Sequence, residues 1–476
     1  MMVVNWIIFS LYIVVYVVTA FVIIMDKKEP VKTLAWLLLL FLLPIIGCIL
    51  YFFFGQDTRR RKSTNKYRAI DLYKSVEKRF MEQDRHDYPV KYAELIRMFV
   101  NQNHAYPFTH NEIEIYESGR PFFDAFLSAI DTAESHIHLE FFIFLDDEIG
   151  NRVADHIIQK AQEGVEVRVL YDDVACWNVK NRFWERMREG GVDVRSFMPV
   201  RYPGLTSKIN YRNHRKIAVI DGKVAFMGGM NIADRYIKGT KEQSWRDTNI
   251  KISGRSVYGL QKVFIGDWYF MDKTLLSGDK YYPKMEFADD SLADNLIQIA
   301  SSSAASRWPD IEQGYVRIIN NAKKYIYIET PYFIPTQPVL FALQTAALGG
   351  IDVRVMVPKK CDNFLVNNAS RSFFPDILKA GAKVYLYDRK VFNHSKVLIC
   401  DDELATVGSV NIDSRSFETS MEVQAFIYSE DIVSRFRDMF ENDMKRCTQF
   451  DINKNQKRSI VIRFWESVVR MLSPLL

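Results

Sequence analysis

The sequence predicts an α/β protein made of two tandem α-β-α sandwich domains that arose by duplication, preceded by a two-helix transmembrane hairpin. Three observations predict this fold: strand-like and helix-like segments alternate after residue 105, their order returns in the second half, and two long apolar runs come first. The predicted parts are a hairpin over 1–57, a connector over 58–105, domains over 106–290 and 291–450, and an amphipathic tail over 451–476.

The two apolar runs at the start are long enough to cross a bilayer. Val3–Met25 is interrupted only by three polar uncharged residues, and Thr33–Phe54 carries no charge. Pro44, near the middle of the second run, is tolerated in lipid when a neighbouring helix satisfies the carbonyl that it leaves unpaired. A cleaved signal peptide is the alternative, but the first run continues past Ala20 and no basic residue precedes it.

Basic residues near the hairpin predict its orientation. The short link between the runs contains three lysines, against four basic residues in the cluster Arg59–Lys62 that directly follows the second run. Positive charge is enriched on the cytoplasmic side, which favours a multi-pass protein of the cell membrane with a cytoplasmic body.

The five cysteines show no CxxC spacing, which argues against a disulfide framework or a cysteine zinc site. The net charge of +5 suits anionic lipid or nucleic acid without deciding between them.

The second half of the chain repeats the first. Ala322–Glu329 echoes Ala133–Glu140, and Gly350–Val355 echoes Gly164–Val169. Two repeats of this size indicate a duplicated domain and not a solenoid. We expect the junction between the repeats near 277–312.

The repeat is tightest at two short polar segments, Asn213–Lys216 and Asn393–Lys396, which lie 180 residues apart. Each has the pattern His-x-Lys-x4-Asp, with an apolar run between the lysine and the aspartate and a glycine and an asparagine further on. By chance a given histidine has both partners about once in 250, and the chain has only eight histidines. The matched positions are His214/His394, Lys216/Lys396, Asp221/Asp401, Gly228/Gly408 and Asn231/Asn411.

These residue types suit chemistry on a phosphate. Residues two apart on a strand project from the same face, so each histidine and lysine point together. If the duplication sets the two strands side by side, two imidazoles and two ammonium groups face one spot. Lysines and asparagine amides bind phosphate oxygens, and an imidazole pair supplies a nucleophile and a general acid. No metal or other cofactor is needed, because the lysines stabilise the developing charge.

The paired motifs resemble those of the phospholipase D superfamily, and the resemblance covers roughly 112–446. It implies that one histidine attacks phosphorus to form a phosphohistidine, while the other protonates the leaving alcohol and then activates the acceptor. His214 is assigned as nucleophile and His394 as acid/base, although the resemblance leaves the two roles interchangeable. The predicted catalytic set is His214, Lys216, Asp221, His394, Lys396 and Asp401, in which the two aspartates are structural partners of the motif.

The resemblance also implies further site residues. Lys216, Lys396, Asn231 and Asn411 match the phosphate-binding positions of the superfamily. An acidic residue on the next strand orients each histidine there: Glu422 fits this position well, and Asp247 fits it less well, with Glu242 as a rival.

Three regions are similar to one group of that superfamily, the bacterial cardiolipin synthases: the motifs, the segment 35–55 and the segment 463–476. This similarity implies that two phosphatidylglycerols are joined to cardiolipin with release of glycerol. The expected partners are therefore phosphatidylglycerol and cardiolipin in the membrane and not nucleic acid. Two alternatives stay open: a nuclease that kept the fold and changed its substrate, and an inactive scaffold, which the two intact motifs disfavour.

The remaining features are weaker. Residues 460–472 predict a short amphipathic helix that either lies on a membrane interface or docks on the protein core. His136 and His138 alternate on a strand and are interpreted as structural. Asp172 and Asp173 follow a strand, but no cluster of other ligands accompanies them.

Overall fold

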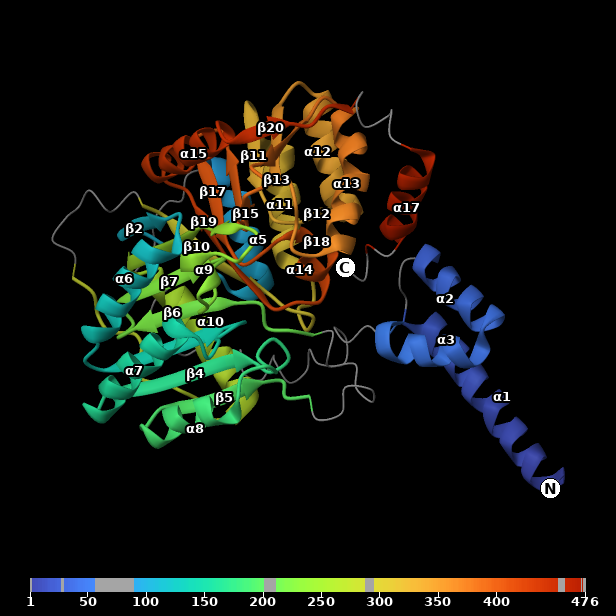
Figure 1. The fold of residues 1–476 in the computed structure, drawn as a ribbon, viewed down its shortest axis with the longest axis horizontal. Coiled ribbons are helices and arrows are strands. Elements are labelled where there is room, and N and C mark those ends of the chain that lie inside the picture. Colours follow the sequence, from blue (N-terminus) through green and yellow to red (C-terminus); the bar gives the residue numbers. More distant parts are fainter. Residues whose placement is uncertain are drawn as a thin grey trace.

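Two α/β units, each built on one mixed sheet, follow an N-terminal group of helices that stands apart from both sheets (Figure 1). The computed structural model describes residues 2–26, 30–55, 90–200, 211–286, 295–452, 459–471 and 473. The predicted duplicated α/β fold is confirmed. The basic cluster Arg59–Lys62 lies outside the described residues.

The first unit is a seven-stranded sheet with the order β2-β9-β7-β6-β3-β4-β5. Neighbours among β3, β4 and β5 run parallel, and the other pairs are antiparallel. The strands are β2 (Asn111–Tyr116), β3 (His136–Phe141), β4 (Glu166–Asp172), β5 (Asp193–Phe197), β6 (Lys216–Ile220), β7 (Val224–Gly228) and β9 (Asn249–Gly254). The helices are α6 (Gly119–Asp131), α7 (Glu148–Gln162), α8 (Asn181–Glu189), α9 (Arg235–Lys238) and α10 (Val257–Asp272).

The second unit repeats this order in a nine-stranded sheet, β1-β10-β19-β17-β16-β11-β13-β14-β20, in which β1 and β20 are additions at the edges. The strands are β1 (Pro107–Phe108), β10 (Ile297–Ser302), β11 (Tyr325–Glu329), β13 (Asp352–Pro358), β14 (Lys383–Tyr387), β16 (Val397–Cys400), β17 (Leu404–Gly408), β19 (Glu422–Ile427) and β20 (Cys447–Gln449). The helices are α5 (Ala93–Asn103), α11 (Asp310–Asn321), α12 (Gln337–Leu348), α13 (Phe364–Leu378), α14 (Ser414–Glu418) and α15 (Glu430–Met444).

A shared core joins the two units. The central strands are buried on both faces, so they read as continuous apolar runs. On β6, Ala218 and Ile220 face the core of the first unit, whereas Ile217 and Val219 face a cluster that also holds Val397 and Ile399 of β16. The inner faces of the two sheets, with α10 and α15, therefore form one hydrophobic interface. This interface fixes the position of one motif relative to the other.

Two segments from early in the chain belong physically to the second unit. Helix α5, which falls in the range predicted as connector, buries Leu95, Ile96 and Phe99 in the core of the second unit. The Phe99 ring lies 4.4 Å from that of Phe426 on β19. Strand β1 pairs with β10, which adds residues 107–108 to the second sheet and not the first.

The N-terminal helices pack on one another. They are α1 (Met2–Met25), α2 (Pro30–Leu42) and α3 (Pro44–Leu50), followed by a short π-helix over Tyr51–Gly55. Tyr51 donates a 2.5 Å hydrogen bond to Asp26 and packs its ring on Trp36, so the end of the second run returns to the end of α1. The second run is not one helix, because Pro44 cannot donate to the preceding turn and begins a new helix.

Among the helices in the described ranges, none meets both the length and the apolarity needed to cross a membrane.

The C-terminal helix α17 (Ile460–Met471) is docked along one edge and exposed along the rest. Val469 is fully buried, and Arg470 stacks on Phe373 of α13 and pairs with Asp376 at 2.6 Å. Phe464 and Trp465 are exposed. Of the two arrangements predicted for this helix, docking on the protein core is therefore observed for one of its faces.

Candidate active site

The two motif segments lie at the junction of the units, each beside a strand or segment of the other unit. The backbone N–H of His214 donates to the carbonyl of Met421 at 2.9 Å, and that of His394 donates to the carbonyl of Arg246 at 2.7 Å. Strand β15 (Val391–Asn393) pairs in parallel with β8 (Ser244–Arg246), and Asn213 forms the corresponding bridge to Met421. The duplication therefore produces an approximate twofold relation centred on the two histidines.

Each histidine pairs with a carboxylate from the opposite unit. Nδ1 of His214 lies 3.1 Å from both oxygens of Glu422, and Nδ1 of His394 lies 2.6 Å from Asp247. Both carboxylates are fully buried, whereas the side chain of His214 keeps 15% exposure and that of His394 keeps 9%. Because a carboxylate only accepts, Nδ1 carries the proton and the lone pair of Nε2 is left for chemistry.

The structure separates the two rival acidic residues of the first unit. Asp247 reaches a histidine, while Glu242 lies on the surface and pairs with Lys360. Asp247 stays ionised despite its burial: burial raises its pKa, but Lys396 and His394 outweigh that effect and lower it. In each unit the chain beyond the motif, Asp247 just after β8 and Glu422 at the start of β19, thus supplies the partner of the other unit's histidine and not of its own.

Two buried lysines accompany the histidines. The ammonium groups of Lys216 and Lys396 donate to the backbone carbonyls of His214 and His394, and Lys396 also lies 3.0 Å from Nδ1 of His394. Burial lowers the pKa of Lys216 well below its usual value and that of Lys396 to about 8. The charge of Lys396 also lowers the pKa of Lys216, so the two halves lie within electrostatic reach.

The same environment keeps both imidazoles neutral at physiological pH. Burial lowers the pKa of His214, and Glu422 opposes part of that effect. Burial together with the charge of Lys396 lowers the pKa of His394 to about 3. A neutral imidazole is the form that can attack phosphorus.

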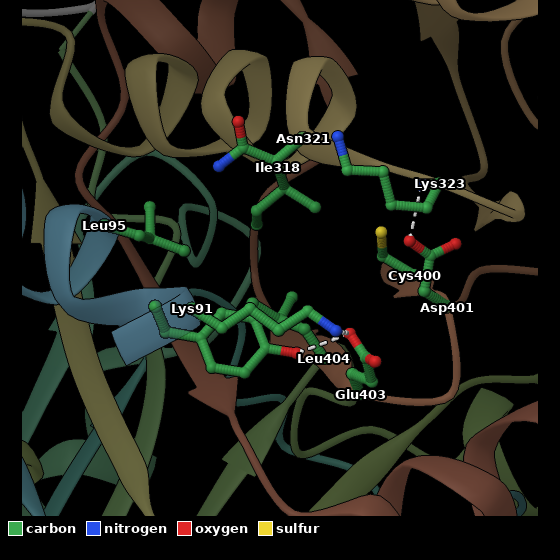
Figure 2. Close-up of a pocket in the computed structure, with 10 residues that line it drawn as sticks. Lys91, Leu95, Ile318, Asn321, Lys323, Cys400, Asp401, Glu403 and Leu404 are labelled. Atoms are coloured by element: carbon green, nitrogen blue, oxygen red, sulfur yellow. Dashed lines mark hydrogen bonds and ion pairs between the residues drawn. The ribbon is translucent and has the colours of Figure 1, made fainter. Parts of the chain in front are cut away.

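The motif aspartates lie at the opposite ends of the motif strands from the histidines. Asp221 accepts hydrogen bonds from the backbone N–H groups of three consecutive residues, 134–136, each at 2.8 Å. Asp401 does the same for residues 323–325, and Figure 2 shows it beside Lys323 in a cavity of about 150 Å³. Both aspartates have positive φ, 53° and 57°, which their short polar side chains tolerate in a tight turn. Their contacts are those of structural residues.

The asparagines differ in their availability. Asn231 accepts from the N–H of Ile143 and donates to Tyr236, so both ends of its amide are engaged. Asn411 is buried, and its side-chain oxygen has no hydrogen-bond partner within the described ranges. Because the two ends of an amide are interchangeable by rotation, Asn411 is the more available donor for a ligand.

Glycines before these asparagines permit close strand packing. A Cβ at Gly228 would meet the Asn249 side chain at 2.2 Å, and one at Gly408 would meet the carbonyl of Val423 at 2.3 Å. Any side chain there would push away the backbone that directly follows a buried carboxylate, after Asp247 in the first unit and after Glu422 in the second.

Several residues that shape the site carry no motif. Phe142 packs its ring 4.9 Å from His214, and Trp245 packs 5.3 Å from His394. Asp172 holds the backbone N–H of Asn213 at 2.9 Å and pairs with the buried Arg212. Only their position at the ends of β3 and β4 and within β8 could have indicated a role.

Two arginines cross the junction beneath the histidines. Arg215 pairs with Asp267 on α10 and donates to the carbonyls of Glu422 and Ser302 in the second unit. Arg246 lies 2.5 Å from Asp443 on α15 and 3.5 Å from Glu329. Each arginine is buried, so these contacts bind the units together at the base of the site.

No group of three histidine, cysteine or acidic side chains in the described part of the chain is arranged to hold a metal ion. His138 is fully buried, bonds to Gln261 at 2.9 Å and stacks on Phe264, as the structural interpretation requires.

The duplicated fold, with one histidine–lysine pair from each half at the junction, defines a phospholipase D-like protein. A family profile described as "Cardiolipin synthase, PLD-like domain" matches residues 126–268 and 315–444, and one described as "Phospholipase_D-nuclease N-terminal" matches residues 14–56. The chain belongs to the family of cardiolipin synthases with phospholipase D-like domains.

Similarity to curated proteins extends over nearly the whole chain. The chain is 38% identical to the major cardiolipin synthase of Bacillus subtilis, and the similarity covers 99% of this chain and 100% of that protein. It is 37% identical to the cardiolipin synthase of Oceanobacillus iheyensis over 96% of each protein. A crystal structure of phosphatidylserine synthase from Haemophilus influenzae matches the fold with a TM-score of 0.60 at 14% identity, covering 80% of this chain and 100% of that chain.

Proposed function

We propose that this protein is a cardiolipin synthase that transfers a phosphatidyl group from one phosphatidylglycerol to another, releasing glycerol. The crossed pairing of His214 with Glu422 and His394 with Asp247 carries this proposal, because it orients two imidazoles beside two buried lysines. Purified protein incubated with phosphatidylglycerol alone should form cardiolipin and glycerol in equal amounts, measured by thin-layer chromatography and a glycerol assay. Phosphatidic acid as the sole product would contradict it.

The reaction proceeds by two displacements at phosphorus. In the first, Nε2 of His214 attacks the phosphodiester, the bond from phosphorus to the glycerol oxygen breaks, and His394 gives that oxygen a proton. In the second, His394 takes a proton from a hydroxyl of the second phosphatidylglycerol. That oxygen attacks phosphorus, and the bond to His214 breaks.

The surrounding residues support these steps. Glu422 and Asp247 orient the imidazoles so that Nε2 faces the substrate, and each stabilises positive charge on its ring. Lys216, Lys396 and the amide of Asn411 bind the phosphate oxygens, where negative charge grows in the transition state. The bound phosphodiester anion also favours the imidazolium form of His394, which raises its low pKa toward the range of a general acid.

The lysine charges predict the alkaline limit of activity. Because burial lowers the pKa of Lys396 to about 8, this lysine loses its charge as pH rises through that value. We expect kcat/KM for phosphatidylglycerol to fall above about pH 8. The check is a pH profile on mixed micelles, with protein stability followed in parallel. A profile that stays flat to pH 10 would show that the Lys396 charge is not used.

The reaction should need no divalent metal, because Lys216 and Lys396 supply the charge stabilisation. Turnover in excess chelator is expected to stay within about twofold of the untreated rate. The control is the same assay with magnesium restored. Loss of activity that only magnesium rescues would place the charge stabilisation on a metal ion instead.

The N-terminal helices are proposed to form a transmembrane hairpin that anchors the protein in the cell membrane. The apolar surface of α1 and α2, where Trp6, Phe21 and Phe41 are exposed, supports this proposal. Phosphatidylglycerol and cardiolipin would then be exchanged with the surrounding lipid. The proposed orientation puts the two α/β units in the cytoplasm, and its support is the basic cluster after the hairpin, since positive charge is enriched on that side.

Thiol labelling tests this orientation. In a variant whose five native cysteines are replaced by alanine, Glu163→Cys introduces an exposed thiol on the first unit. We expect it to resist an impermeant reagent in intact cells and to react after lysis. A cysteine introduced in the link between α1 and α2 should show the opposite pattern. Labelling of residue 163 before lysis would reverse the topology.

A further inference from the structure

Two turns occupy equivalent places beside the two histidines. The first, 173–180, connects β4 to α8, and the second, 359–363, connects β13 to α13. The first turn follows the carboxyl end of β4, and the second follows the carboxyl end of β13. Each of these strands pairs in parallel with the strand, β3 or β11, that leads toward a histidine. The turns therefore border the site from opposite units.

Matching contacts join each turn to its histidine. In the first turn, Cys176 bonds to the carbonyl of Phe142, whose ring lies 4.9 Å from that of His214. In the second, Cys361 bonds to the carbonyl of Pro331, and Asp362 accepts from Tyr332, whose ring lies 6.4 Å from that of His394. Each turn is thus one side chain away from the reacting groups.

Both turns present large apolar side chains to solvent. Trp177, the residue after Cys176, is 48% exposed. Phe364 and Leu365 begin α13 directly after the second turn, and they are 68% and 36% exposed. One exposed apolar residue needs no explanation, but a pair of equivalent turns that expose them on either side of one site does.

Basic side chains accompany these apolar ones. Lys180 is exposed at the end of the first turn, and Lys359 is exposed at the start of the second. The neighbouring acidic groups are engaged within the protein, since Asp173 accepts from Trp177 and Val200, and Asp362 accepts from Tyr332. Tryptophan and phenylalanine beside lysine suit the boundary between acyl chains and anionic headgroups.

We propose that Trp177, Phe364 and Leu365 form an interfacial rim that inserts into an anionic bilayer around the mouth of the site. This proposal rests on the proposed function and adds the surface by which the site meets its lipid. Because the rim has one half on each unit, it sets both motifs at the same depth, so that a headgroup enters without its acyl chains leaving the bilayer.

Fluorescence quenching tests the insertion directly on the full-length protein in phosphatidylglycerol nanodiscs. Lipids brominated along their acyl chains should quench part of the tryptophan emission, and Trp177→Phe should remove a quenched component while keeping an apolar ring. Trp308→Phe, at another tryptophan of 47% exposure, provides the comparison. If emission from Trp177 is equally intense with brominated and ordinary lipids, the rim does not reach the acyl region.

Kinetics test whether the rim serves the site. The double variant Phe364→Ala/Leu365→Ala should raise KM for bilayer phosphatidylglycerol by about tenfold or more, as loss of two inserted side chains implies. Its turnover of monomeric dihexanoyl phosphatidylglycerol should stay within about twofold. The matched control is Phe341→Ala/Leu348→Ala, which removes the same two residue types from exposed positions on α12.

The outcomes separate the two proposals. Equal losses on monomeric and bilayer substrate would mean that the substitutions damage the site, and equal losses in the control would mean a general apolar surface; either result overturns the rim. If the wild-type protein forms no cardiolipin from phosphatidylglycerol in either form, the proposed function fails. The quenching result then still decides whether the rim inserts.

Discussion

Replacing His214 or His394 with alanine should each lower cardiolipin synthesis by at least about 10⁴-fold. The reason is that one displacement needs the nucleophile and both need the proton carrier, so neither imidazole can compensate for the other. The measurement is formation of cardiolipin from phosphatidylglycerol by the purified variants, with thermal melting to check that each is folded. His156→Ala is the matched control, because His156 pairs with Asp131 on the surface and should leave activity unchanged.

The same variants distinguish the two histidine roles. With a phosphatidyl substrate that carries a good leaving group, the first displacement needs no general acid. His394→Ala should then release the leaving group and accumulate the phosphohistidine, while His214→Ala should do neither. The reverse pattern would exchange the assigned roles. Retention of more than about a tenth of the wild-type activity by either variant would refute the two-histidine scheme.

Replacing Arg246 with methionine should destabilise the protein by about 3–5 kcal/mol, as removal of one partner from a buried ionic cluster does. Arg246 is buried, and its guanidinium contacts Glu329, Asp443 and Ser395 of the second unit. Thermal melting in detergent is the measurement. Arg437→Met provides the control, because Arg437 pairs with Asp402 and Asp438 near the surface and should cost under about 1 kcal/mol.

The destabilisation should depend on pH in a stated direction. Burial raises the pKa of Glu329 to about 7 even with Arg246 present, and loss of the arginine raises it further. Above the ordinary carboxyl pKa of 4.5, Glu329 keeps its proton in the folded variant but loses it in the unfolded chain. The stability of the variant therefore rises as pH falls. We expect the deficit of Arg246→Met to grow as pH rises above about 7, where Glu329 ionises in the wild-type protein but stays protonated in the variant. A deficit that is independent of pH would mean that lost packing, not the unpaired carboxylate, is responsible.

The sequence alone determined the duplicated α/β architecture and the residue types at the candidate site. Strand periodicity and the repeat of Asn213–Lys216 at Asn393–Lys396 are local properties, and the sequence displays them directly. The aspartates were also accessible to this reasoning. A polar residue after a buried strand marks a tight turn, and Asp221 and Asp401 cap backbone N–H groups there.

Only the tertiary structure decided which carboxylate serves which histidine. Spacing identified Glu422 and left Asp247 and Glu242 as rivals, but it did not assign either carboxylate to a particular histidine. In the fold the inner faces of the two sheets meet, so β8 runs beside β15 and Met421 beside Asn213, and the partners cross between units. The roles of Arg215 and Arg246 depend on the same meeting of the units.

The placement of α5 and of the two site-bordering turns was likewise a tertiary matter. A polar, helix-forming stretch reads as a connector until Phe99 is seen against Phe426, because amphipathicity shows that a face is buried but not in which unit. Trp177 and Phe364 carry no motif, and only the exposure of both beside one site distinguishes them from ordinary core residues. Sequence patterns thus determine what each segment buries, whereas the contact between segments distant in the chain determines what those residues do.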